Sequence, residues 1–64
     1  MKSAKEMFKE LGYERQEDEK NIIYTKGSRV ITFMKGLSYR FNFPVKYATQ
    51  EEMKACYKQQ MENR

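Results

Sequence analysis

The chain has 64 residues, 39% of them hydrophobic and 34% charged, and a formal net charge of +4 at pH 7. A chain of this length is predicted to form a single domain, residues 1–64, with a small core. No apolar run approaches the ~20 residues of a membrane span, and no apolar segment of the signal-peptide kind follows the charged start of the chain, so a cytoplasmic protein without membrane contact is expected. A lone cysteine, Cys56, fits the same reducing compartment.

A short helix is predicted from about residue 4 to 11. Ser3 and Glu6 have the spacing of a capping box, in which each side chain accepts a hydrogen bond from the backbone amide of the other residue. An apolar stripe at helical spacing follows the cap: Ala4, Met7, Phe8 and Leu11. Gly12 stands where a left-handed residue ends a helix, and Tyr13 is placed to pack back on it in a Schellman arrangement.

Residues 14–20 are strongly polar and are predicted to form a solvated turn. As an alternative, residues 13–17 add a short edge strand that pairs with residues 22–26. The run from Glu17 to Glu19 holds three carboxylates, but it lacks the alternating oxygen ligands and central glycine of a calcium loop, so no metal is expected there. The role of this acidic run stays open.

The strongest fold signal lies in residues 22–43, which read IIYTKGSRVITFMKGLSYRFNF. Three runs rich in β-branched and aromatic residues are separated by two glycine-marked turns, a pattern typical of a three-stranded antiparallel meander. Gly27-Ser28 suits a two-residue type II′ turn, because the first central position of that turn needs a positive φ. The second turn is predicted as a three-residue loop, Met34-Lys35-Gly36, with Gly36 in the left-handed position of a G1 bulge.

This register pairs Phe33 with Leu37 and Ile31 with Tyr39. Side chains alternate along strands with period two, so one face becomes apolar and the other mild and partly basic. The apolar face holds Ile22, Tyr24, Ile31, Phe33, Leu37, Tyr39, Phe41 and Phe43. The open face holds Ile23, Thr25, Val30, Thr32, Ser38, Arg40 and Asn42. A rival register, with Lys35-Gly36 as a two-residue loop, would expose Ile31 and Phe33 as a stacking platform for bases.

A second helix is predicted from about residue 50 to 62. Pro44 cannot donate to a ladder and ends the last strand, and residues 45–48 form a connector. Thr49 and Glu52 repeat the capping box. A stripe at helical spacing follows: Met53, Cys56, Tyr57, Gln60 and Met61. The methionines and the cysteine of this stripe are interpreted as core residues that fill irregular gaps.

Together these elements predict an α+β fold in one small domain with α-β-β-β-α order. Its centre is a three-stranded antiparallel meander, with a fourth short edge strand as an option, and both helices pack on one face of the sheet. A homodimer that covers the open sheet face or an edge strand is compatible with so small a core.

Enzyme chemistry is not expected. The absence of histidine removes the commonest general base, the usual nucleophile pairs and typical zinc sites, and one cysteine cannot build a cysteine zinc cluster. The three glycines are isolated, so no phosphate-binding loop exists. No cofactor is predicted.

Residues 20–50 are the basic part of the chain, with six basic side chains and no acidic one. The candidate partner-binding or phosphate-binding residues are Lys26, Arg29, Lys35, Arg40 and Lys46. Their charge favours an acidic protein surface or a phosphate backbone as the partner. A second interpretation is that these charges keep the sheet edges and turns from aggregating.

The element order is similar to that of a double-stranded-RNA-binding domain. That family contacts phosphates through lysines at the start of its second helix, where this chain has Gln50, Glu51 and Glu52. Acidic side chains at these positions would repel the phosphate backbone of RNA, so the shared element order does not imply RNA binding.

Three stretches, residues 4–13, 22–24 and 49–55, resemble small proteins encoded by phages and prophages of Gram-positive bacteria. The resemblance implies a phage accessory role, in which a small protein acts by binding a host factor. The sequence therefore predicts a non-catalytic accessory protein that binds another macromolecule, preferably a host protein. The alternative is a small basic nucleic-acid-binding module that uses the Lys/Arg side of the sheet.

Overall fold

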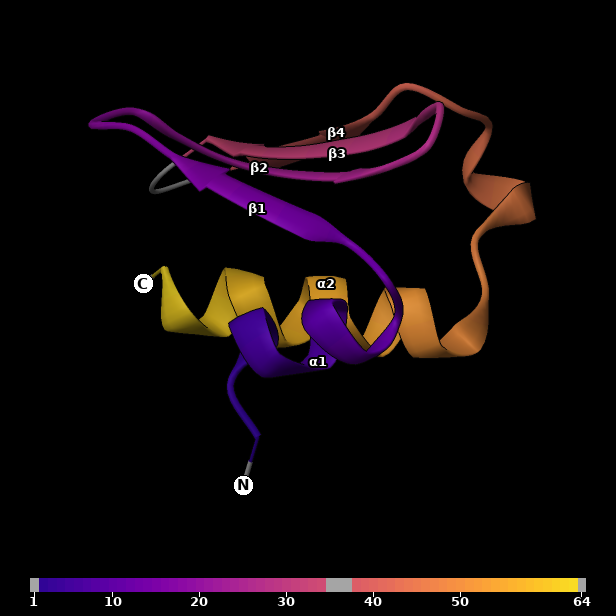
Figure 1. Cartoon of the computed structure of the whole chain (residues 1–64), viewed down its shortest axis with the longest axis horizontal. Helices are drawn as coiled ribbons and strands as arrows, with labels where there is room; N and C mark the ends of the chain where they lie inside the picture. Colours follow the sequence, from indigo (N-terminus) through magenta and orange to yellow (C-terminus); the bar gives the residue numbers. More distant parts are fainter. Residues whose placement is uncertain (1, 35–37, 64) are drawn as a thin grey trace.

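The computed structural model describes residues 2–34 and 38–63, and in it a four-stranded antiparallel sheet carries two helices on one face (Figure 1). In chain order the elements are α1 (Ala4–Glu10), β1 (Glu14–Glu17), β2 (Asn21–Lys26), β3 (Arg29–Met34), β4 (Ser38–Phe41), the 3₁₀ helix η1 (Val45–Tyr47) and α2 (Gln50–Glu62). The sheet order β1-β2-β3-β4 is a simple meander. The predicted α+β class and element order are confirmed, and the optional edge strand is present as β1.

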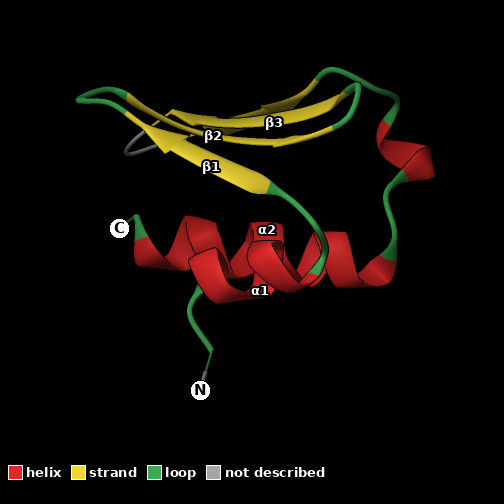
Figure 2. Cartoon of the chain, in the orientation of Figure 1, coloured by secondary structure: helices red, strands yellow, loops and turns green. Residues whose placement is uncertain are grey.

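Figure 2 shows the sheet as one layer and α1 and α2 side by side in the other. The amide of Ala4, at the start of α1, donates to Glu62 Oε2, at the end of α2, over 3.0 Å. The two helices therefore run antiparallel. None of the helices within residues 2–34 and 38–63 has the length and apolar character needed to cross a bilayer.

Both ends of α1 carry the signals predicted for them. The Ser3 hydroxyl accepts from the Glu6 amide over 3.2 Å, and the Glu6 carboxylate accepts from the Ser3 amide over 3.3 Å. At the other end Gly12 has a φ of 93°. The Tyr13 amide then donates to the Phe8 carbonyl over 3.0 Å, which is the long hydrogen bond of a Schellman motif.

The first hairpin also forms as predicted. Lys26 pairs with Arg29 around Gly27 and Ser28. Gly27 has a φ of 60°, and Ser28 is not among the residues with positive φ. Type I′ would need positive φ at both positions, so the turn belongs to type II′.

The predicted register between β3 and β4 is wrong. Phe33 pairs with Tyr39 and Ile31 pairs with Phe41, each two residues beyond the predicted partner. A shift of two residues leaves every side chain on its predicted face, because side chains alternate with period two. The predicted apolar face is therefore unchanged by the shift in register.

The rival register is wrong as well. Met34 pairs with Ser38, which leaves three residues between the strands where the rival register has two. The predicted bulge at Gly36 and the position of Leu37 lie outside the described residues.

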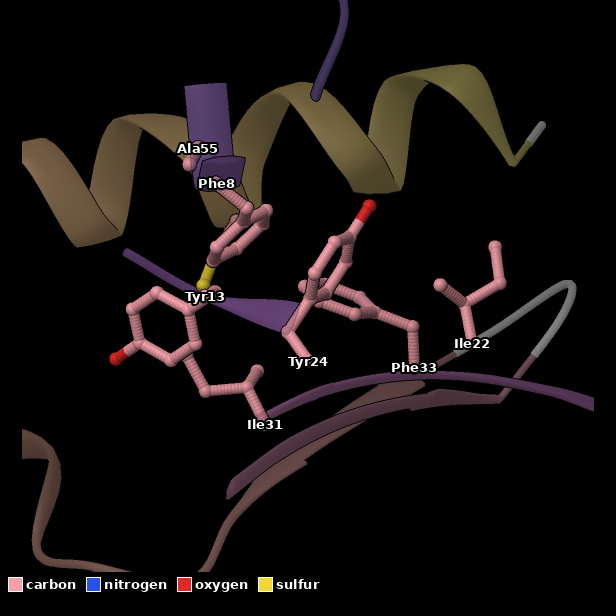
Figure 3. Close-up of a cluster of buried hydrophobic side chains, with 8 residues drawn as sticks. Phe8, Tyr13, Ile22, Tyr24, Ile31, Phe33 and Ala55 are labelled. Carbon is pink, nitrogen blue, oxygen red and sulfur yellow. The ribbon is translucent and has the colours of Figure 1, made fainter. Parts of the chain in front are cut away.

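The core lies between the sheet and the helices (Figure 3). Its members are Phe8, Tyr13, Ile22, Tyr24, Ile31, Phe33, Ala55 and Cys56. The Phe8 ring stacks on Tyr24 with centroids 3.9 Å apart and meets the edge of Tyr13 at 5.4 Å. Aromatic pairs of this kind each contribute about 0.5–1.5 kcal/mol beyond the burial of their area. These rings fill most of the space between the two layers.

α2 has its predicted bounds and capping box, but a different face of it meets the core. The buried residues of α2 are Glu52, Ala55, Cys56 and Gln59. Of the predicted stripe only Cys56 is buried, whereas Met53, Tyr57 and Met61 are exposed. The aromatic rings from α1 and the sheet leave room for small side chains at the centre of α2, such as Ala55 and Cys56. On either side of them, buried tyrosine hydroxyls donate to Glu52 and Gln59.

Candidate functional site

The structure does not gather the predicted basic residues on one free surface. Lys26 and Arg29 form a cross-strand pair on the helix side of the sheet, because they alternate in phase with the core residues of β2 and β3. Arg40 pairs with Thr32 and lies on the opposite, open face. Lys46 belongs to η1, and its ammonium group lies 5.3 Å from the centroid of the neighbouring tyrosine ring. Lys35 lies outside the described residues.

Arg29 is already engaged within the fold. Its Nη2 donates to Glu52 Oε1 over 2.9 Å and to the Tyr47 carbonyl over 3.1 Å. Its guanidinium also lies 4.0 Å from the centroid of the Phe43 ring, a cation–π contact. Arg29 therefore ties β3 to η1 and to the start of α2. A phosphate ligand would have to compete with all of these contacts.

Glu52 is the centre of this arrangement, which we call the Glu52 network and define as Glu52, Thr49, Tyr13 and Arg29. Only 4% of Glu52 is exposed. Its Oε2 accepts from the Tyr13 hydroxyl over 2.5 Å, and its Oε1 accepts from the Thr49 amide over 2.8 Å as well as from Arg29. The network joins the segment between α1 and β1, the strand β3 and the start of α2 through one carboxylate.

The protonation states in the Glu52 network point to a structural role. Burial raises the pKa of the Glu52 carboxyl, but the hydrogen bonds from Tyr13 and Thr49 and the charge of Arg29 outweigh burial and hold that pKa below its ordinary value. Burial and the bond to Glu52 raise the pKa of Tyr13 to about 12. A charged carboxylate that accepts three hydrogen bonds is a poor general base, so the network serves to hold elements together.

Cys56 is a second chemistry-bearing group that the fold makes inert. Its side chain is buried beside the aromatic core. Burial raises the pKa of the thiol to about 12, so the nucleophilic thiolate is not formed at neutral pH. Within residues 2–34 and 38–63, no cluster of three or more potential ligand side chains is placed to hold a metal ion.

The outward side of the helical layer carries an open, largely apolar hollow. A hollow of about 390 Å³ lies there, which we call the helix groove. It is lined by Lys2, Met7, Lys54, Tyr57, Lys58 and Met61. The α2 members lie on the side of that helix opposite its buried residues. In Figure 1 the segment before α1 leaves the helical layer on the side away from the sheet.

The helix groove continues toward the other end of the helix pair. A smaller hollow of about 190 Å³ shares Lys2, Met7 and Lys54 with it and adds Glu10, Leu11 and Glu51. The two hollows together follow the antiparallel helix pair. The charged side chains of the helix groove are all lysines, whereas the smaller hollow is mixed in charge.

Sequence reasoning missed the helix groove because it assigned Tyr57 and Met61 to the core. The volume of the aromatic side chains could have revealed it, because the sheet and α1 already supply enough of them to fill the core. In a thin two-layer domain, a helix that faces such a core offers small side chains, as Ala55 and Cys56 do here.

Comparisons of this chain with protein-family models, with curated proteins and with solved structures each found no significant match.

Proposed function

We propose that this chain is a non-catalytic binding protein that recognises another protein through the helix groove. The proposal is supported mainly by the distribution of side chains on α2, which buries polar residues and exposes large apolar ones. The helix buries Glu52 and Gln59 while it leaves 64% of Tyr57 and 49% of Met61 exposed in a hollow. Large apolar side chains gathered in this way are typical of protein interaction sites.

The residue types of the helix groove suit a protein partner. Tyrosine and methionine are enriched in protein interfaces, and tyrosine often anchors them because it adds large contact area at low entropic cost. Methionine is flexible and polarisable, so Met7 and Met61 can adapt their shape to a partner side chain. Complete burial of a large apolar side chain contributes about 1.5–3 kcal/mol, so covering the exposed parts of Tyr57 and Met61 would favour a complex.

The proposal extends to an accessory role of the phage or prophage type, with a host protein as the partner. Its support is the resemblance carried by the caps and core positions of both helices and the first strand. Some of the same residues, such as Glu6 and Thr49, cap the two helices whose outward sides form the helix groove.

A basic nucleic-acid site remains the weaker alternative. Of the residues assigned to phosphates, Arg29 is held by Glu52, and Arg40 lies on the face opposite Lys26. A phosphate backbone is bound most strongly by cations that share one surface. We therefore propose a protein partner.

Photo-cross-linking in a Gram-positive bacterium tests the proposal. One protein carries photoreactive benzoylphenylalanine in place of Tyr57, in the helix groove, and a matched protein carries it in place of Arg40, on the open sheet face. We expect a discrete, nuclease-resistant protein adduct from position 57 that disappears when Met61→Lys is added. Adducts formed mainly from position 40, or adducts removed by nuclease, would overturn the proposal.

A further inference from the structure

The charge and shape of the helix groove identify the kind of partner segment that fits it. We infer that the helix groove binds an acidic amphipathic helix of the partner protein. This inference rests on the proposed function and names the chemistry of its partner. Apolar side chains of the bound helix lie against Met7, Tyr57 and Met61, and its carboxylates lie against Lys54 and Lys58.

The shape of the site favours a helix. The groove is built by two antiparallel helices, so a third helix can lie in the depression between them, as helices pack in bundles. From residue 51 to residue 61 the α2 axis rises by about 15 Å, which matches almost three turns of a bound helix. An extended strand would leave backbone amides without partners over an apolar floor, whereas a helix satisfies its own.

The charge of the groove determines which charge the bound helix should carry. Lys2, Lys54 and Lys58 are the charged side chains of the groove, and two of them lie one helical turn apart on α2. Lys2 is already paired with the Glu10 carboxylate, with Nζ 2.6 Å from Oε2. The attraction for carboxylates and the repulsion of basic segments therefore come mainly from Lys54 and Lys58. The acidic part of the bound helix lies over the helix groove. Where the bound helix extends over the smaller hollow, which holds Glu10 and Glu51, it is neutral or basic.

Two other occupants fit less well. A lipid surface is broad and cannot enter a hollow between two helices, and Glu10 and Glu51 on the same side would repel anionic headgroups. A second copy of this chain also fits less well. Its α1 carries equal numbers of lysines and glutamates, and the outward side of its α2 carries Lys54 and Lys58, which would repel the same lysines of the first copy.

An unbiased peptide selection tests the inference. The full chain selects from a random library of peptides of about 16 residues, which are long enough for four helical turns. The parent protein is compared with Lys54→Glu/Lys58→Glu in the groove and with a matched control, Lys5→Glu/Lys9→Glu on α1, outside the groove lining. Methyl NMR signals of Met7 and Met61 report occupancy, and Met34 on the open sheet face is the reference.

We expect the parent and the control to enrich acidic peptides with apolar residues at helical spacing that shift the signals of Met7 and Met61 and leave Met34 unchanged. The groove variant should prefer neutral or basic peptides and bind the parent's peptides about tenfold more weakly.

The remaining outcomes separate the inference from the proposed function. Groove-binding peptides without acidic preference would overturn the inference alone. Failure to enrich any peptide, or shifts confined to Met34, would overturn both. Shifts of Met7 and Met61 caused by vesicles of anionic phospholipid, or by raising the protein concentration without peptide, would also overturn both, in favour of a lipid surface or of a second copy.

Discussion

The two sides of α2 reverse the usual arrangement of an amphipathic helix. On the inner side Glu52 and Gln59 are buried, with exposed fractions of 4% and 2%, and both are hydrogen-bonded to tyrosine hydroxyls. On the outer side Tyr57 and Met61 lie in a hollow open to solvent. A buried polar group is tolerated only when it is satisfied, so the inner side is a structural connection. An exposed apolar group has no such internal partner and is available to another molecule.

This contrast separates stability from binding within one helix. Substitutions on the inner side should lower the free energy of unfolding, and substitutions on the outer side should lower affinity for the partner. A variant on either side that changed the wrong property would break the comparison.

The largest effect is expected at Glu52. Glu52→Ala removes the shared acceptor of Tyr13, Arg29 and the Thr49 amide and should lower the free energy of unfolding by about 3 kcal/mol. Urea denaturation measures the change. The adjacent exposed Glu51→Ala is the matched control and should stay within about 0.5 kcal/mol of the parent. Equal losses in the two variants would contradict the role of the Glu52 network.

Acid should weaken the same network by a smaller amount. The pKa of Glu52 is held below its ordinary value of 4.5, so its contribution to stability is fully present above that pH and is lost as the pH falls through the folded-state pKa. Urea titrations between about pH 6 and pH 3 should show this loss in the parent. Glu52→Gln has no carboxyl to titrate, so its curve should be flatter over the same range; parallel curves would rule out Glu52 as the source.

The hydrogen bond between Tyr24 and Gln59, on the same buried side of α2, should contribute less to the free energy of unfolding than the Glu52 network does. Tyr24→Phe removes the hydroxyl that donates to Gln59 Oε1 over 2.6 Å and leaves that buried amide oxygen without this donor. We expect a loss of about 1–2 kcal/mol in the free energy of unfolding. Tyr57→Phe makes the same chemical change on the exposed side and should leave stability unchanged. A Tyr24→Phe protein as stable as the parent would show that this hydroxyl adds nothing.

Local signals in the sequence predicted most of the fold. Capping boxes at Ser3 and Thr49, the glycine turn at Gly27 and period-two alternation each depend on a few neighbouring residues. The register of β4 was not predictable in the same way, because a slip of two residues leaves the pattern of faces unchanged. The two registers differ only in which residues pair, such as Phe33 with Tyr39, and that choice depends on tertiary packing.

The candidate site was harder to predict, for two different reasons. The inward position of Arg29 was contained in the alternation of β3, since Arg29 shares its phase with Ile31. The rotation of α2 was not, because two faces of that helix have helical spacing. The choice between them depends on the hydroxyls of Tyr13 and Tyr24, which reach across the core to Glu52 and Gln59.

The smallest effect on stability is expected on the outer side of α2. Tyr57→Ser should change the free energy of unfolding by no more than about 0.5 kcal/mol, because most of the residue is already exposed to water. The same substitution should lower the affinity for a groove-selected peptide by about thirtyfold, as expected for the loss of an interface anchor that contributes about 2 kcal/mol. Urea denaturation and a fluorescence-anisotropy titration measure the two properties on one sample. Loss of stability together with affinity would mean that Tyr57 supports the fold, and the division between the two sides of α2 would then fail.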